Sequence, residues 1–242
     1  MFQIQCLQSS QISATEYYCK YSMGPFIKGQ GTTVGNALRR VLLSNIQGVA
    51  IIGVRITGIE HEFSTIPNVN EDVVDILLNL KQIVLKGDLK EPALARLNTK
   101  KPGLVTANSI ELPTSISLVD SQQYIACLNK AGNLEMEFLI AQGQNYITSS
   151  NSQYILPTGF LAVDAVFMPV SKVNFFVETS RNLYLNNSIK TLDIMSNLES
   201  LILEVSTNGS MKPSEALSYS AEILENTFKK NSVNVYFLKK KI

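Results

Sequence analysis

A glycine-rich segment, Gly29-x-Gly31-x-x-x-Gly35, stands directly before a stretch with helical periodicity. The free N–H groups at a helix N-terminus attract anions, so this segment is a candidate phosphate-binding turn. Its glycine spacing matches neither GxGxxG nor the P-loop spacing, the two patterns typical of nucleotide-binding turns. A small-molecule enzyme with an anion site between Gly29 and Gly35 is therefore kept only as an alternative hypothesis.

The histidine and cysteine residues give no sign of a metal site or a catalytic triad. His61 is the one histidine of the chain, and it is not part of an HExxH zinc motif. Cys6, Cys19 and Cys127 are odd in number and form no CxxC pair, which argues against a zinc ribbon or a disulfide framework. We expect free thiols in a reducing compartment.

Two arginines and a leucine suggest a contact with another protein. Apolar residues recur with the spacing of one helical face at Val34, Ala37, Leu38, Val41 and Leu42. Leu43 is expected on the opposite side of that helix, together with Arg39 and Arg40. An apolar spot beside forked guanidinium donors suits a partner that presents carboxylates. The alternative is one exposed leucine with two solvated arginines.

Length and composition limit the class of protein. The chain has 242 residues, 45% hydrophobic and 17% charged, with a formal net charge of +1. This composition is globular, and the length suits one large domain or two modest ones. The near-neutral charge argues against a general nucleic-acid binder, which needs a surplus of Lys and Arg. We expect no membrane span, since no apolar run approaches ~18 residues, and no secretory leader.

Helices near both ends and one between them would position these residues. The first helix would begin at a cap formed by Thr32 or Thr33 and end at residues 47–48. A second is expected over 70–81, with acidic residues in its first turn and apolar residues on more than one side. A third would start at Pro213. Its apolar face would contain Ala216, Leu217, Ala221, Leu224 and Phe228.

The remaining segments favour strands and turns. Residues 142–153 are polar and are expected to form a flexible loop, and the Asn-rich stretch from Arg181 to Asn197 fits no element. Strands are expected within residues 1–30, 49–56, 83–146, 162–167, 172–178 and 201–205.

The stretch from Lys28 to Leu43 contains Asn36-Ala37-Leu38-Arg39-Arg40 and resembles the opening helix of a known family, the α subunit of bacterial-type DNA-directed RNA polymerase. Three more blocks resemble this family in the same order: 61–65 with 71–81, then 159–170, then 203–217. Together they span most of the chain. The Lys28-Gly29-Gln30 form, with residues 83–86, is most similar to plastid versions.

The resemblance implies an α+β fold with two interleaved domains. A dimerisation domain would be built from both chain ends, residues 1–47 and 174–242, and a mostly-β insert domain would occupy 48–173. The first and last helices of two copies would pack together. The residues that we expect in this homodimer interface are Val34, Leu38, Val41, Leu42, Leu217, Ala221, Leu224 and Phe228.

The implied role is assembly of DNA-directed RNA polymerase, a nucleotidyltransferase, for transcription. An α homodimer would recruit the β subunit and then β′, and DNA would be met only through the complex, with no membrane partner. The contacts with the large subunits would use Arg40 and Leu43, Lys81 at the end of the second helix, and His61. The catalytic Mg²⁺ would belong to β′, so we expect no catalytic residue, metal or cofactor in this chain.

The sequence departs from the family pattern at three places. The chain stops at Ile242, where the family commonly continues into a DNA-binding domain, so we expect no such domain here. Lys212 replaces the usual capping residue before Pro213, and the stretch 182–197 is longer than in bacterial relatives. The plastid-like features predict a chloroplast stroma location, with the bacterial cytoplasm as the alternative. An archaeal- or eukaryotic-type relative is disfavoured by the close match at Asn36–Arg40.

Overall fold

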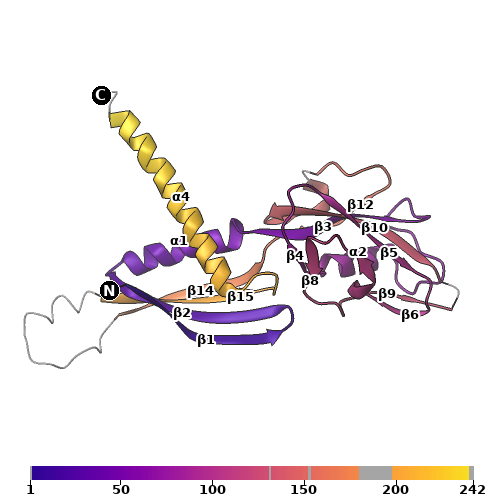
Figure 1. Ribbon diagram of the computed structural model, residues 1–242, viewed down its shortest axis with the longest axis horizontal. Coiled ribbons are helices and arrows are strands. Elements are labelled where there is room, and N and C mark those ends of the chain that lie inside the picture. Colours follow the sequence, from indigo (N-terminus) through magenta and orange to yellow (C-terminus); the bar gives the residue numbers. More distant parts are fainter. Residues whose placement is uncertain (1, 131, 152–153, 180–197, 240–242) are drawn as a thin grey trace, which may run out of the picture. The chain divides into compact units, whose positions relative to one another are not determined.

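The computed structural model describes residues 2–130, 132–151, 154–179 and 198–239, which are mostly β-strand with few helices (Figure 1). Its contacts divide the chain into two compact units. We call residues 1–46 with 170–242 the terminal unit, and residues 47–169 the middle unit. The predicted domain bounds were 47/48 and 173/174. The roles of the units as dimerisation domain and insert domain stay a prediction.

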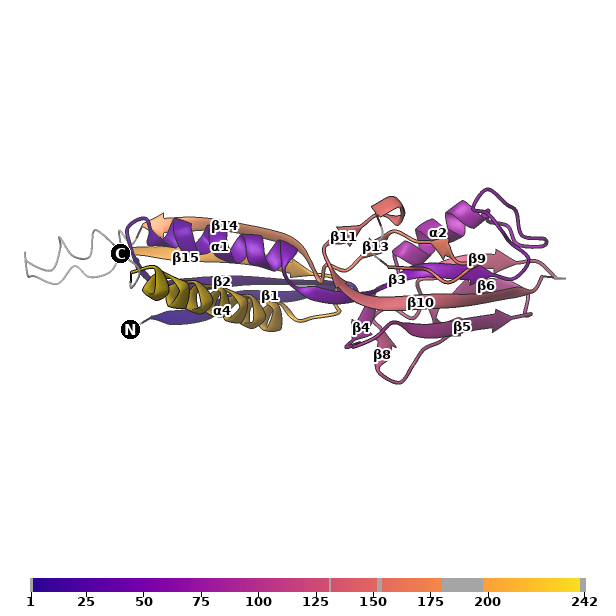
Figure 2. The same cartoon turned by 90° about the horizontal axis from the view of Figure 1, so that it is seen from above.

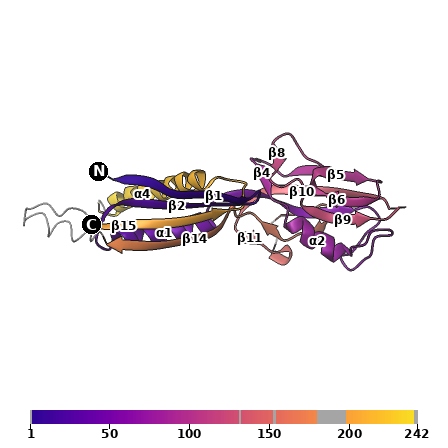
Figure 3. The ribbon, with the colours of Figure 1, turned by 90° about the horizontal axis from the view of Figure 1, so that it is seen from below.

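Strands from both ends of the chain form one antiparallel sheet in the terminal unit, seen from below in Figure 3. Its order is β1 (Gln3–Ser13), β2 (Glu16–Ile27), β15 (Leu198–Thr207) and β14 (Val170–Thr179). Tyr21 pairs with Leu203 and Cys19 pairs with Val205, and all four side chains are buried. Because side chains alternate between the faces of a strand, these residues mark one buried face.

Two helices cover this buried face. They are α1 (Gln30–Ser44) and α4 (Pro213–Lys239). Leu38 and Leu42 of α1 and Ala216 and Leu217 of α4 join the same apolar cluster as the sheet residues. Helix α1 runs along β14 (Figure 2), whereas the later turns of α4 extend away from the sheet (Figure 1).

Helix α4 begins at Pro213, as predicted, and the residue before it, Lys212, is not of a capping type. The backbone N–H of Lys212 donates to Oε2 of Glu215 at 3.2 Å. This is half of a capping box, in which the acidic residue three positions into the helix binds the N–H before it. Glu215 therefore replaces part of the stabilisation that is lost because Lys212 is not a capping residue.

The middle unit is built on a larger antiparallel sheet. Its order is β7 (Ile110–Glu111), β5 (Ala93–Thr99), β10 (Leu134–Gln144), β3 (Gln47–Ile56), β4 (Leu85–Gly87) and β8 (Ile116–Leu118), and β12 (Leu161–Ala162) also pairs with β3. Two ribbons accompany it: β6 (Gly103–Thr106) with β9 (Tyr124–Leu128), and β11 (Tyr146–Ile147) with β13 (Ala165–Val166). Short 3-10 turns lie at Ala107–Ser109 and Ser149–Asn151.

One helix, α2 (Val73–Lys81), packs on a face of this sheet. Val73, Ile76 and Leu80 of α2 belong to the same buried cluster as Val54 and Phe138 of the two central strands. A smaller cluster, which includes Ile52 and Phe167, is separate from it. The middle unit therefore has its own core, built from period-2 strands and one amphipathic helix.

Three local predictions were wrong. Helix α1 begins at Gln30, not at a Thr32 or Thr33 cap: the residue before it is Gly29 with φ of +89°, and no side chain caps the helix. Residues 142–144 belong to β10 and 146–147 to β11, so much of the predicted loop is strand. The polar side chains of this segment did not indicate strand, because the backbone pairing of β10 with β3 and of β11 with β13 needs no apolar residue.

The third wrong prediction concerns the second helix, α2, which begins at Val73 and is buried on one side only. Val74 is 37% and Leu78 52% exposed. Only the Val73, Ile76 and Leu80 side of α2 meets the sheet, and the described residues leave its outer side open. The stretch from Arg181 to Asn197 lies outside the described residues.

Candidate functional site

The glycine-rich turn holds a carboxylate of the chain itself. The backbone N–H of Gly29 donates to Oε2 of Glu199 on β15 at 2.9 Å, and Glu199 is only 9% exposed. A carboxylate at a helix N-terminus is the interaction that an anion-binding turn would make with a ligand. The position that the phosphate-binding hypothesis requires is therefore filled from within the chain.

The glycines of the turn let α1 approach the sheet. A Cβ atom on Gly35 would lie 2.5 Å from the ring of Phe175 and 3.0 Å from Leu201, and one on Gly31 would lie 3.3 Å from Val177. The first of these distances is far shorter than van der Waals contact. Gly31 and Gly35 are thus explained by helix–sheet packing rather than by a ligand.

Arg39 and Arg40 are exposed on α1, as predicted, and neither guanidinium forms a hydrogen bond or ion pair with the described residues. Leu43 differs from its prediction. Its side chain is partly buried against the core of the terminal unit, so Leu43 does not lie on the side of α1 opposite that core. Because Leu43 is only ~100° around the helix from the fully buried Leu42, its side chain still reaches the edge of the core.

The predicted dimer-interface residues fall into two groups. Leu38, Leu42 and Leu217 are 5%, 1% and 8% exposed, so their own chain already covers them. Val34, Val41 and Leu224 are partly exposed, and Ala221 and Phe228 are exposed, the latter at 65%. The first group supports the helices from beneath, and only the second group is accessible to a partner.

Lys81 closes α2 and lies in a polar cluster of the middle unit. Its Nζ donates to the hydroxyl of Tyr146 at 3.0 Å and to Oδ2 of Asp164 at 3.2 Å, and lies 4.8 Å from the centre of the Tyr146 ring. Tyr146 also donates to Oδ2 of Asp164 at 2.5 Å, and the N–H of Ser149 donates to Oδ1 at 2.8 Å. We call Lys81, Tyr146 and Asp164 the Lys81 cluster.

The cluster favours the charged forms of both ionisable ends. The Tyr146 hydroxyl, then the Ser149 N–H and Lys81, lower the pKa of Asp164 to about 2. The hydrogen bonds with Tyr146 and Asp164 raise the pKa of Lys81. At neutral pH the cluster therefore contains a carboxylate and an ammonium.

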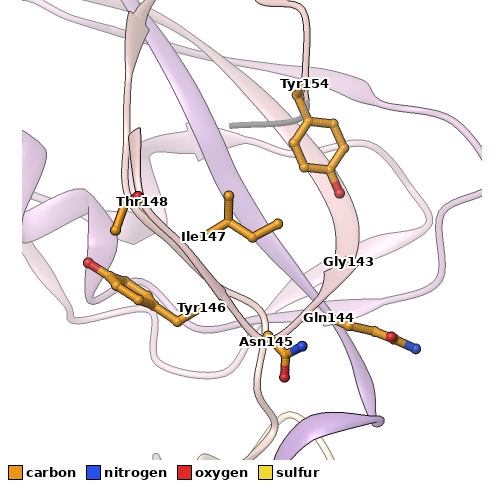
Figure 4. Close-up of a pocket in the computed structure, with 7 residues that line it drawn as sticks. All are labelled: Gly143, Gln144, Asn145, Tyr146, Ile147, Thr148 and Tyr154. Atoms are coloured by element: carbon orange, nitrogen blue, oxygen red, sulfur yellow. The ribbon is translucent and has the colours of Figure 1, made fainter. Parts of the chain in front are cut away.

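Sequence reasoning identified Lys81 but missed Tyr146 and Asp164 as its partners. They lie 65 and 83 residues further along the chain, so no local spacing points to them. Tyr146 also lines a pocket of about 560 Å³ (Figure 4). The other residues that line it are Gly143, Gln144, Asn145, Ile147, Thr148 and Tyr154.

His61 lies in an exposed turn, where its ring contacts the hydroxyl of Ser64 at 3.0 Å. The neighbouring Phe63 is 81% exposed.

Across the part of the chain that the structure describes, no three His, Cys, Asp or Glu side chains gather as a metal site would require. Nor does any helix in the described ranges have the length and apolarity to cross a membrane.

This chain is similar to known proteins along most of its length. A family model described as the RNA polymerase Rpb3/RpoA insert domain matches residues 54–168. The DNA-directed RNA polymerase subunit alpha of Emiliania huxleyi is 54% identical over 95% of this chain and 71% of its own length. The same subunit of Rhodomonas salina is 46% identical over 92% and 68%, and that of the cyanobacterium Synechocystis is 45% identical over 94% and 69%.

Proposed function

The chain belongs to the α-subunit family of DNA-directed RNA polymerase, and we propose that it acts as the assembly subunit of such an enzyme. Two copies form a homodimer, and the dimer recruits the β and β′ subunits for transcription. The observation that carries this proposal is the identity to α subunits over more than nine tenths of the chain.

The proposed homodimer is formed by the helices of the terminal unit. Helix α4 extends away from its own sheet and exposes Phe228 at 65% and Tyr219 at 40% (Figure 1). A long helix with unburied aromatic side chains is stabilised when a second copy covers it. In this proposal Ala221, Leu224 and Phe228 meet the partner directly with Val34 and Val41, while Leu38, Leu42 and Leu217 hold the helices in place.

The proposed contact with a large subunit is centred on Arg40. Its side chain is exposed on α1, and its guanidinium has no hydrogen-bond or ion-pair partner in the described part of the chain. An arginine offers five N–H donors in a planar fork that fits a carboxylate. Leu43 is a lesser part of this contact, since it is partly buried in the terminal unit. Lys81 and His61 are proposed as further contacts on the middle unit.

We assign no catalytic step to this chain. The nucleotidyl transfer and its metal ions are proposed to belong to the large subunits, and the α subunit contributes to catalysis by assembling them. DNA is met only through the complex. The relatives from algae and cyanobacteria support a plastid location, in the stroma, with the cytoplasm of a bacterium as the alternative.

The test is capture of the large subunits by a tagged α chain. Wild-type protein should form a dimer and retain β and β′. Arg40→Ala should leave the dimer intact and weaken capture of β by about tenfold, the effect of losing one charge-assisted hydrogen bond.

Arg39→Ala is the matched control, because this neighbouring arginine is equally unpaired in the described structure, and it should capture β as wild type does. Undiminished capture by Arg40→Ala would show that the contact is elsewhere. A wild-type chain that retains no large subunit would contradict the assembly role.

A further inference from the structure

The outer side of α2 carries a stripe that ends at the Lys81 cluster. Val74, Leu78 and Lys81 follow one another at spacings of four and three residues, so they lie along one face of the helix. Val74 and Leu78 are 37% and 52% exposed, and Tyr146 beside Lys81 is 41% exposed. An accessible apolar strip therefore leads to a lysine whose head group is held in place.

Lys81 is fixed more firmly than a surface lysine usually is. A free lysine side chain loses up to about 2 kcal/mol of rotamer entropy when a partner immobilises it. Here the Tyr146 hydroxyl and the Asp164 carboxylate already hold Nζ, and the Tyr146 ring lies beneath it at 4.8 Å. The Lys81 side chain loses this entropy during folding, so the binding of a partner to Nζ does not carry the same cost again.

The hydrogen bonds also leave one donor available. An ammonium group has three N–H donors, and two of them are used by Tyr146 and Asp164 in the described structure. Asp164 is itself fixed by the Tyr146 hydroxyl and the Ser149 N–H, so it holds Lys81 from a rigid position.

We propose that Tyr146 and Asp164 are positioning residues that aim the third N–H group of Lys81 at a neutral acceptor, a backbone carbonyl, on a large polymerase subunit. This inference rests on the proposed function, in which Lys81 contacts such a subunit. Val74 and Leu78 receive apolar side chains of the same segment.

The charge of the cluster explains why the acceptor is neutral. Lys81 and Asp164 together have no net charge, and Oδ2 of Asp164 lies 3.2 Å from Nζ, so repulsion by Asp164 would cancel a large part of the attraction that Lys81 exerts on a carboxylate at the third N–H. A carbonyl gains the hydrogen bond without that repulsion. Arg40 differs, because no carboxylate of the described chain is paired with it.

The first experiment is a double-mutant cycle on capture of purified β and β′ by the full tagged chain. Lys81→Ala should weaken capture by about tenfold. Asp164→Asn and Tyr146→Phe should each weaken it in the wild-type background and add nothing further in the Lys81→Ala background, because both act through Lys81. Tyr146→Phe keeps the ring and removes only the hydroxyl, so it serves if Asp164→Asn does not fold.

Matched controls come from the same unit. Lys86→Ala removes another exposed lysine, and Asp120→Asn removes another carboxylate that accepts a backbone N–H, that of Gln122. Both should capture the large subunits as wild type does and keep the wild-type unfolding midpoint within a few degrees. Asp164→Asn loses part of its stability, so it should be shown to be folded at the temperature of the capture assay.

The outcomes separate the two proposals. No loss with Lys81→Ala removes Lys81 from the contact and overturns this inference, while Arg40 still tests the assembly role. A loss with Lys81→Ala but none with Asp164→Asn and Tyr146→Phe overturns positioning alone. Equal losses from these variants in both backgrounds would mean that they act on folding, and would also overturn it.

The second experiment tests the acceptor by salt. The loss caused by Lys81→Ala should stay the same from about 0.05 M to about 0.5 M salt, because a bond to a carbonyl joins no opposite charges, whereas the loss caused by Arg40→Ala should shrink. If both losses shrink together, the acceptor of Lys81 is charged and the neutral-acceptor proposal is wrong.

Discussion

At the scale of single residues, Glu199 decides the chemistry of the glycine-rich turn. Gly29, with φ of +89°, turns its N–H toward this nearly buried carboxylate 170 positions away. The turn thus has the geometry of an anion site and already contains its anion. A phosphate ester would have to displace a carboxylate that is covalently part of the fold, which explains why the motif does not indicate an enzyme.

Asp164 makes stability depend on pH in a predictable direction. Its pKa is lowered from 3.8 to about 2 by the Tyr146 hydroxyl, the Ser149 N–H and Lys81. A carboxyl group with a lower pKa in the folded state stabilises the fold above its ordinary pKa, and this contribution is lost as the pH falls through the folded value.

We therefore expect the difference in unfolding free energy between wild type and Asp164→Asn to be constant near neutral pH and to shrink from about pH 4 to about pH 2. Denaturant unfolding at a series of pH values measures it. A difference that does not change over this range would contradict the assignment of Asp164 as an ionised hydrogen-bond acceptor.

At the scale of elements, α1 depends on close approach to the sheet. The contact of its Gly35 backbone with Phe175 and Leu201 leaves no space for a side chain. Gly35→Val should therefore destabilise the chain by about 1–3 kcal/mol, the cost of overpacking a core. Thr32→Val places the same β-branched residue on the exposed side of the helix and should change stability by less than about 0.5 kcal/mol.

Urea unfolding of both variants measures this difference. The measurement also bears on assembly, because Arg40 lies on the same helix, and a displaced α1 would move its guanidinium. Equal midpoints for Gly35→Val and wild type would show that the helix can move away from Phe175 at little cost, and that the glycine is not required for packing.

At the scale of the whole molecule, the proposed dimer determines whether α4 is covered. Phe228→Asp places a charge where we expect the partner's apolar surface, so the variant should be monomeric at concentrations where wild type is a dimer. Its helical content should stay close to that of wild type in the part of α4 next to the sheet, because Phe228 makes little contact with its own chain.

Sedimentation velocity distinguishes monomer from dimer. Asn226→Asp is the matched control, since it adds the same charge at an exposed position two residues earlier on α4. If Phe228→Asp remains a dimer, or if wild type is monomeric at every concentration, the interface proposed for α4 is wrong. An obligate interface of this kind buries on the order of 2,000 Å² or more, so the effect of one central charge should be large.

Local patterns in the sequence predicted much of this architecture. A run rich in β-branched residues predicted β3, helical spacing predicted α1, Pro213 predicted the start of α4, and motifs in a fixed order identified the family. The elements depend on neighbours within about four residues, so a single sequence contains the information that specifies them. The exposed position of Arg40 followed from the same helical spacing.

Contacts across long separations were decided only by the tertiary structure. Glu199 binds Gly29 and Asp164 binds Lys81 across 170 and 83 residues, and Leu43 meets a core whose edge depends on how far α1 sinks toward Phe175. Packing between elements decides which partners a side chain meets. The free energy of that packing is shared among many contacts, so the spacing of residues along the sequence does not specify it. The sequence by itself determined most of the elements and the family, while the three-dimensional arrangement determined which charges are satisfied and which remain for a partner.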